Sequence, residues 1–199
     1  FLSISLGEIT IDDFNPFGVA FDSNENAIWI SDNKNNRVIR IKNPYSKPTI
    51  DIVIGQNDKT GNCCNLDDSC EDKDYKTGKG FNREEIPAAG KKGLCNPSSI
   101  FIDENRNLFI TDSFYDWNEG NKRIVTHNLD NIDAQKNQVL FSDELEGADK
   151  VYTKRNFNDL VCTESDEPDP LPCRPVYSAA FENNLIVTVD SYGNPDPYK

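Results

Sequence analysis

The chain has 199 residues, of which 28% are charged and 36% belong to the hydrophobic set. This composition excludes a disordered chain and predicts a folded core in one or two domains. Asp and Glu outnumber Lys and Arg by 34 to 21, which gives a net charge of −13. This charge excludes nucleic acid as an expected partner, because it repels phosphate backbones. It suits solubility, a bound cation or a basic partner.

The chain begins at Phe1 and contains no Met, so we expect a processed product or an excerpt of a longer protein. No run reaches the roughly 20 apolar residues of a membrane-spanning helix, so no membrane span is predicted. The first expected element is a strand at Leu2–Gly7, whose sequence is similar to Ile50–Gly55. That similarity predicts the outer strand of a preceding unit.

The first full unit opens with Pro16–Asp32, where two apolar stretches flank an Asn-rich turn at Ser23–Asn26. Asn tolerates left-handed backbone, so the run predicts an antiparallel hairpin with Ala27–Ile30 as its second strand. A third strand is expected at Arg37–Ile41 and a fourth at Ile50–Gly55.

The link from Gln56 to Cys95 is long and acidic. Hard oxygen donors suit calcium, although the segment lacks the residue order of an EF-hand loop, and most acidic runs are simply solvated. No cofactor is expected apart from this ion. The candidate calcium ligands are Asp67, Asp68, Glu71, Asp72 and Asp74.

An even number of cysteines in loops rich in Asn, Asp and Gly predicts disulfides and an oxidising compartment. Free thiols or a metal site are the alternative, although the chain has a single histidine, His127, and no Cys-x-x-Cys pair. The most local pairing joins Cys162 to Cys173, which leaves the other four to pair among themselves. The six residues are Cys63, Cys64, Cys70, Cys95, Cys162 and Cys173.

A second unit begins at Pro97–Asp112, which repeats the hairpin with a turn at Glu104–Asn107 and a strand at Leu108–Ile110. Its third strand is expected at Arg123–Thr126 and its fourth at Gln138–Phe141. A third copy of the hairpin, Pro175–Asp190, has its second strand at Leu185–Val189.

The repeat has a regular spacing. Asp32 and Asp112 are 80 positions apart, and Asp112 and Asp190 are 78 apart. The strands are nearly continuous in apolar character, which is typical of sheets covered on both faces. Stacked four-stranded antiparallel sheets meet that requirement, and the β-propeller is their common closed form. We therefore predict an all-β fold, a partial β-propeller of such sheets.

The turn between the second and third strands resembles the signature of NHL repeats. In the first unit, Asp32 is followed by a polar turn and then by Asn36-Arg37-Val38, after a matching Gly-Val-Ala-Phe-Asp strand at Gly18–Asp22. The second unit has Asp112 and Arg123 with six extra residues between them. The resemblance implies an NHL-type propeller of the bacterial kind, with long blades and inserted loops.

Other segments share this resemblance, because Ile52–Gln56 is similar to the outer-strand motif of that family and Cys95-Asn96-Pro97 to its blade entry. We expect the pairs Asp32–Arg37 and Asp112–Arg123 to be structural bonds across the turn. The alternative is direct ligand contact by either arginine.

The pattern predicts about two and a half blades. We expect residues 1–15 to form the outer strand of a preceding blade and a link, 16–96 and 97–174 two blades with inserted loops, and 175–199 half a blade. Unmatched ends of this kind favour association, so Leu2–Gly7 of one copy is a candidate partner for Pro175–Asp190 of another.

In a propeller, the long links and the turn after each second strand lie on one face, where exposed aromatic and acidic residues suit a carbohydrate or peptide ligand. The alternative is that the aromatic side chains form a small core of the loop itself. The candidate binding residues are Tyr75, Phe114, Tyr115, Asp116 and Trp117.

The sequence favours a binding or scaffold module over an enzyme, because one histidine cannot build a multi-histidine zinc centre and no Gly-x-Ser-x-Gly motif is present. The alternatives are a structural subunit of a surface assembly and a piece of a propeller hydrolase or lyase. The expected partners are a protein, a carbohydrate or further copies of the chain. The cysteines predict an extracellular, cell-surface or periplasmic location.

Overall fold

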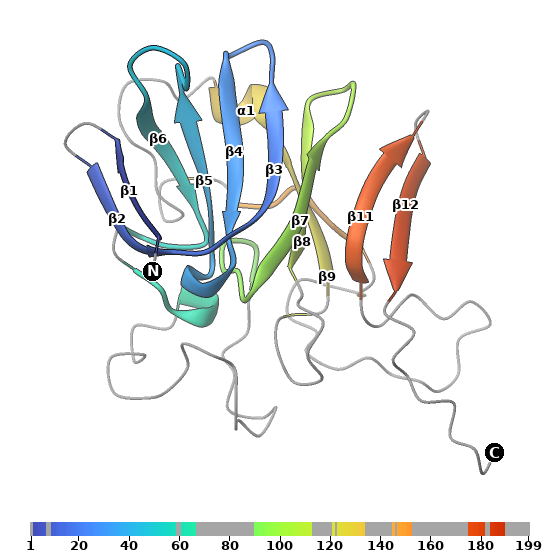
Figure 1. The fold of residues 1–199 in the computed structure, drawn as a ribbon. Coiled ribbons are helices and arrows are strands. Elements are labelled where there is room, and N and C mark those ends of the chain that lie inside the picture. The colour runs from blue at the N-terminus through green and yellow to red at the C-terminus, as the bar shows by residue number, and fades with distance from the viewer. Residues whose placement is uncertain are drawn as a thin grey trace, which may run out of the picture.

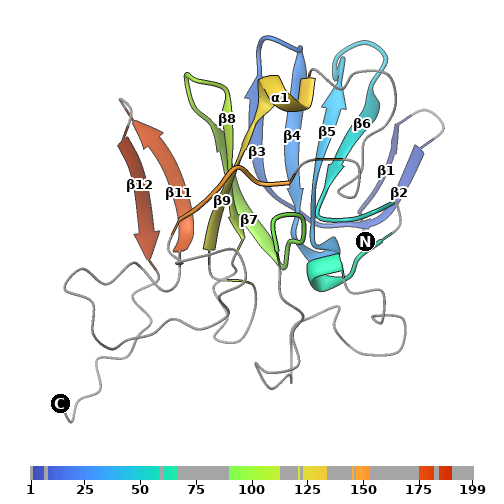
Figure 2. The ribbon, with the colours of Figure 1, turned by 180° about the vertical axis from the view of Figure 1, so that it is seen from behind.

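The computed structural model describes residues 2–6, 9–58, 61–66, 90–112, 121, 123–133, 145, 147–152, 175–181 and 184–189. These residues form strands arranged in four antiparallel sheets, with three short helices between them. Figures 1 and 2 show the sheets side by side, like neighbouring blades.

The first four-stranded sheet has the strand order β3-β4-β5-β6. Every neighbouring pair is antiparallel, as the successive hairpins of the sequence require. The predicted strands of this unit are confirmed to within two residues at each end. Their bounds are Pro16–Asp22 (β3), Ala27–Asp32 (β4), Arg37–Lys42 (β5) and Thr49–Ile54 (β6).

The second four-stranded sheet has the order β10-β9-β8-β7. The prediction of its fourth strand at Gln138–Phe141 was wrong, because the strand that pairs with the outer edge of β9 is β10, while residues 138–141 lie outside the described part. A short helix, α1 (Leu129–Asp133), follows β9, so the fourth strand comes later in the sequence than predicted. The strands are Pro97–Ile102 (β7), Asn107–Asp112 (β8), Arg123–Asn128 (β9) and Lys150–Tyr152 (β10).

Two hairpins flank these sheets. β11 (Pro175–Phe181) pairs with β12 (Asn184–Val189), and β1 (Leu2–Leu6) pairs with β2 (Ile9–Phe14). β2 corrects the expectation that only a link separates the first strand from Pro16. Its residues alternate between Ile and polar side chains up to Asp12, the period that favours a strand.

The main core lies between the two four-stranded sheets. Trp29, Val38 and Ile52 of the first sheet pack with Leu108 and Ile110 of the second, all at most 1% exposed. The inner strands stack in sequence order, because β3 contacts β7 and β7 contacts β11. The fold is therefore a partial β-propeller of stacked four-stranded sheets.

A second core lies on the other side of the first sheet. Phe14 at the end of β2 packs there against Ile39, Ile41, Ile50 and Val53 of β5 and β6. The N-terminal hairpin thus lies against the outer strands of this sheet (Figure 1).

The tight turns use left-handed backbone, although not always at Asn. Asn26 has a φ of 47° in the first hairpin, as the turn sequence predicts. In the equivalent turn of the second sheet the left-handed residue is Arg106, with a φ of 59°. The Arg106 side chain makes three ion pairs, which offset the backbone strain of this conformation.

Candidate functional site

The turn after β4 is built around a buried carboxylate. Arg37 donates from Nε to Asp32 Oδ2 over 2.8 Å, and Asn35 donates to both carboxylate oxygens at 3.0 and 2.9 Å. The backbone N–H of Asn15 donates to Asp32 Oδ1 over 2.9 Å, which joins the turn to the chain entering β3. Arg37 is only 3% exposed, and its positive charge is paired with the buried Asp32 carboxylate of the turn.

The turn after β8 repeats this arrangement around Asp112. Arg123 Nε donates to Asp112 Oδ2 over 2.8 Å, Asn121 Nδ2 donates to the same oxygen over 2.6 Å, and the Cys95 N–H donates to Oδ1 over 2.7 Å. Burial raises the pKa of Asp112 above its ordinary value, against the charge of Arg123 and these donors.

Arg123 also holds the link that precedes the second sheet. Its two terminal nitrogens donate to the carbonyls of Gly90 and Gly93, each over 2.7 Å. The Arg123 side chain is 1% exposed, so among the described residues its role is to hold the link in place.

Asparagine side chains connect the two turns. Asn65 and Asn121 exchange hydrogen bonds of 2.9 and 2.7 Å through their side-chain amides. Asn36 accepts from the Asn96 N–H over 2.7 Å and donates to the Asn62 carbonyl over 2.8 Å. Each of these bonds joins residues at least 26 positions apart, so the network fixes the course of the long first link.

A disulfide reinforces the same region. Cys64 and Cys95 are bonded across a sequence separation of 31 residues and are 3% and 2% exposed. Cys63 is disulfide-bonded too. The remaining cysteines, Cys70, Cys162 and Cys173, lie outside the described residues.

These contacts gather at one end of the sheets, where β4, β6 and β8 finish. We call it the insertion end and define it by Asp32, Gln56, Cys95 and Asp112. Three long segments, 67–89, 113–120 and 153–174, are bordered by described residues at this end. The strand pairings show that β8 and β10 both finish beside the start of β9.

The segments themselves lie outside the described residues, and so do the predicted ligand contacts and calcium ligands. Within the described part of the chain, no group of three His, Cys, Asp or Glu side chains is placed to hold a metal ion. The residues concerned are Asp67, Asp68, Glu71, Asp72, Asp74, Tyr75, Phe114, Tyr115, Asp116 and Trp117.

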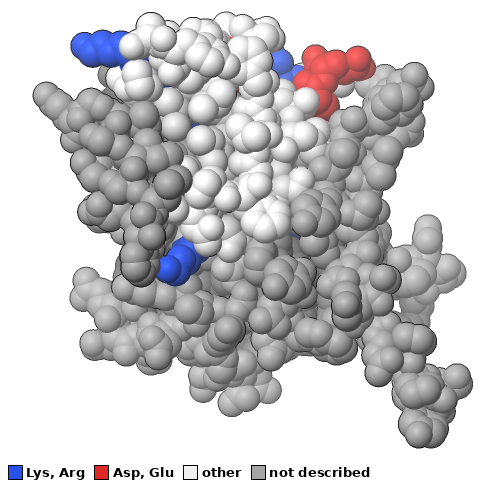
Figure 3. Space-filling model, in the orientation of Figure 1, with Lys and Arg blue, Asp and Glu red and all other residues white. Residues whose placement is uncertain are grey.

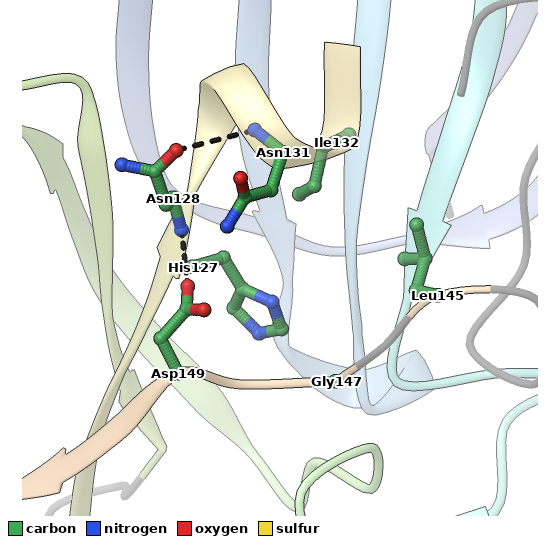
Figure 4. A pocket seen from close by; sticks show the side chains of 7 residues that line it. All are labelled: His127, Asn128, Asn131, Ile132, Leu145, Gly147 and Asp149. Atoms are coloured by element: carbon green, nitrogen blue, oxygen red, sulfur yellow. Dashed lines mark hydrogen bonds between the residues drawn. The ribbon is translucent and has the colours of Figure 1, made fainter. Parts of the chain in front are cut away.

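His127 borders a small cavity at the opposite end of β9 (Figure 4). Ile132 and Leu145 form its apolar wall, and its volume of about 10 Å³ is room for roughly one water molecule. Burial lowers the pKa of His127 to about 4, Asp149 opposes that shift and Arg123 adds to it. A neutral imidazole in so small a space is a packing residue, and the cavity is too small for an organic substrate.

An ion-pair cluster that the sequence analysis did not predict joins the two sheets. Arg40 of β5 contacts Asp51 at 2.7 Å and Asp133 of α1 at 2.5 Å, and Arg106 contacts Asp22 at 2.7 Å and also Asp133. Burial disfavours the charge of Arg40, but the bonds and charges of Asp51 and Asp133 outweigh it and raise its pKa. One available signal was an arginine in the middle of the apolar strand Arg37–Lys42.

The fold and its buried turns define part of a β-propeller with inserted segments. No protein-family model matches the chain, and no curated protein matches it. Among solved structures, it is similar to a luciferin-regenerating enzyme, at 16% sequence identity and a TM-score of 0.40. The similarity covers 92% of this chain and 40% of that one, so the chain spans less than half the length of that protein.

None of the helices in the described part of the chain has the length and apolar character needed to cross a bilayer.

Proposed function

We propose that the chain is part of an extracellular NHL-type β-propeller that binds a ligand through the segments at its insertion end. The observation that carries this proposal is that the described residues bordering three long segments lie at one end of the sheets. Loops on a rigid scaffold are where binding residues concentrate. The Asp-to-Arg turn with its buried ion pair occurs in both four-stranded sheets, and this repetition supports the NHL type.

The fixed ends of the first link support a binding role. A segment that binds a partner loses less conformational entropy if its ends are already ordered. The Cys64–Cys95 disulfide, the Asn65–Asn121 amide pair and the bonds from Arg123 to the link provide that order. The disulfide also supports an oxidising location outside the cytoplasm.

A binding role fits the described residues better than catalysis. Arg37 and Arg123 are paired with buried carboxylates, and His127 is neutral and buried. The sequence of residues 113–120 combines Phe114, Tyr115 and Trp117 with acidic neighbours. Aromatic rings beside carboxylates suit a carbohydrate or a peptide, which is the ligand class we propose.

The test is a screen of the 199-residue chain on glycan and peptide arrays, followed by titration calorimetry with the best array compound. Trp117→Ala is expected to weaken binding by about tenfold or more. The matched control is Tyr45→Ala, because Tyr45 is 86% exposed in a turn at the opposite end of the sheets. Absence of binding on both arrays, or equal losses in the two variants, contradicts the proposal.

A further inference from the structure

The face of the molecule shown in Figure 3 carries few charged side chains at its centre, among the residues that the structure describes. A polar group that needs a hydrogen-bond partner lies inside the molecule instead. His127 is 3% exposed, and its neutral imidazole has one N–H donor and one acceptor nitrogen. Buried donors and acceptors are nearly always paired with protein groups or with ordered water, so the surroundings of this ring indicate what it binds.

The imidazole is directed into the small cavity beside α1 (Figure 4). Two hydrogen bonds join the residues that line this cavity. The Asn128 N–H donates to Asp149 Oδ2 over 2.5 Å, and the Asn131 N–H donates to Asn128 Oδ1 over 3.2 Å. The imidazole takes part in neither bond. The cavity volume of about 10 Å³ is the room that one water molecule needs, and it is too small for an organic molecule.

The walls of the cavity combine apolar and acceptor groups. Ile132 and Leu145 are 5% and 3% exposed and form the apolar side. The Asp149 carboxylate lies beside the ring (Figure 4), and its charge opposes the lowering of the His127 pKa that burial causes. Since Asn128 bonds to Asp149 Oδ2, the other carboxylate oxygen is the acceptor that faces a molecule in the cavity.

The segment that carries Asp149 is held at a fixed distance from β9. The Ala148 N–H donates to the Lys91 carbonyl over 2.8 Å, and the Asp149 N–H donates to the Thr126 carbonyl over 2.8 Å. Gly147 has a φ of 89°, and a Cβ there would lie 2.8 Å from Lys91 Cβ, so only glycine allows this close approach. Because backbone contacts hold the segment on both sides, the cavity does not close by a shift of Asp149 towards the ring.

We propose that this cavity is a binding site for one water molecule, which links the imidazole of His127 to the carboxylate of Asp149. The water donates to Asp149 Oδ1, because an ionised carboxylate can only accept. The water oxygen then faces the imidazole, so the ring nitrogen on the cavity side carries the proton and donates to the water. The bound water thereby joins β9 to the segment that enters β10, and it fixes one tautomer of His127. This site is independent of ligand binding at the insertion end.

The first test is a crystal structure of the 199-residue chain at a resolution that shows ordered water. A density peak is expected in the cavity, within about 3.2 Å of an imidazole nitrogen and of Asp149 Oδ1. An imidazole bonded directly to a protein group overturns the proposal. So does a cavity without a peak when the His127 and Asp149 side chains are well ordered.

Two variants show whether the imidazole holds the water. His127→Phe keeps a ring and removes both nitrogens, so the peak should be lost. Tyr45→Phe is the matched control, because it removes one polar atom from an aromatic side chain that is 86% exposed elsewhere, and it should keep the peak. Circular dichroism establishes that both variants are folded, and His127→Leu replaces His127→Phe if the latter is not. A peak that persists without the imidazole contradicts the proposal.

The tautomer of His127 is a readout that a packing role alone would not change. Long-range proton–nitrogen correlation spectra of the native chain at pH 7 should show one protonated ring nitrogen, since the pKa of about 4 keeps the ring neutral. Asp149→Asn removes the charge that orients the water, so both tautomers should appear. Asp130→Asn is the control, because the Asp130 side chain is 69% exposed and does not line the cavity.

Two spectral results would overturn the link through water. A mixture of tautomers in the native chain would show that no single partner orients the ring. A single tautomer that is unchanged in Asp149→Asn would show that Asp149 does not orient the water.

Discussion

At Gly18 the backbone of the first sheet lies close to the backbone of the second. A Cβ built there would lie 2.6 Å from the Ser98 carbonyl oxygen and 3.0 Å from the Ile100 nitrogen, both backbone atoms. Its N–H also donates to Ser31 Oγ, which donates in turn to the Ser98 carbonyl. The close approach of β3 to β7 therefore depends on the absence of a side chain at Gly18.

Gly18→Ala is expected to destabilise the fold by about 1–3 kcal/mol, because β3 and β7 must separate to admit the methyl group. The measurement is urea unfolding followed by tryptophan fluorescence. Ser23→Ala, in the exposed turn that follows β3, should change stability by about 0.5 kcal/mol or less. Equal effects of the two substitutions would show that the contact between the strands relaxes freely.

His127 predicts a dependence of stability on pH. Its pKa is about 4 in the folded chain and about 6.5 when unfolded, so the unfolded chain binds the extra proton between these values. The stability due to the neutral imidazole is thus present above about pH 6.5 and is lost as the pH falls towards 4. Between pH 7 and pH 5 the loss from this residue is about 2 kcal/mol.

Urea unfolding at pH 7 and pH 5 measures this loss in the native chain and in His127→Gln. The variant removes the imidazole while all carboxylates remain, so the difference between the two pH slopes belongs to His127. Parallel slopes would mean that the folded chain takes up the proton as readily as the unfolded one.

The cluster around Asp133 connects separate elements: a strand of the first sheet, a turn of the second and α1. Asp133 contacts Arg40 and Arg106, and its side chain is 10% exposed. Asp130, one helical turn earlier, contacts Arg106 as well, but its side chain is 69% exposed. The two carboxylates therefore offer a comparison between a shielded and a solvated ion pair.

Asp133→Asn is expected to cost about 2–3 kcal/mol, because it leaves the 1% exposed Arg40 with one fewer counter-charge. Asp130→Asn should cost about 0.5 kcal/mol or less, since exposed pairs contribute little. Thermal unfolding of the two variants under the same conditions checks the order, and a larger loss in Asp130→Asn would contradict the assigned role of α1.

Elements with local signals could be predicted from the sequence, and those that depend on distant contacts could not. The hairpin Pro16–Asp32 and the strand after Arg37 follow from alternating apolar stretches and turn residues. The shift of the fourth strand from Gln138–Phe141 to Lys150–Tyr152 follows from α1, whose five residues are too few to show helical periodicity. Arg40 meets Asp133 across 93 positions, and no local pattern reports such a contact.

At the scale of the whole molecule, the excess of acidic residues acts against the compact state. The chain carries a net charge of −13, so its carboxylates repel one another when the fold brings them together in dilute salt.

Raising the ionic strength is expected to stabilise the fold, because at 0.1 M salt the repulsion between exposed carboxylates more than about 10 Å apart is largely screened. Urea unfolding in low and moderate sodium chloride measures the change in the free energy of unfolding. A loss of stability with salt would indicate that attractive ion pairs, such as those of Arg106, outweigh the repulsion.

The disulfide and the asparagine pairs at the insertion end stabilise the borders of the first link independently of the sequence between them. The borders of the first link are held by the Cys64–Cys95 disulfide and the Asn65–Asn121 pair, which lie outside the segment 67–89. If this segment binds the ligand as we propose, substitutions there other than at Cys70 should change recognition with little cost to folding. On that proposal, specificity could change by substitution of this segment alone, while the sheets keep their stability.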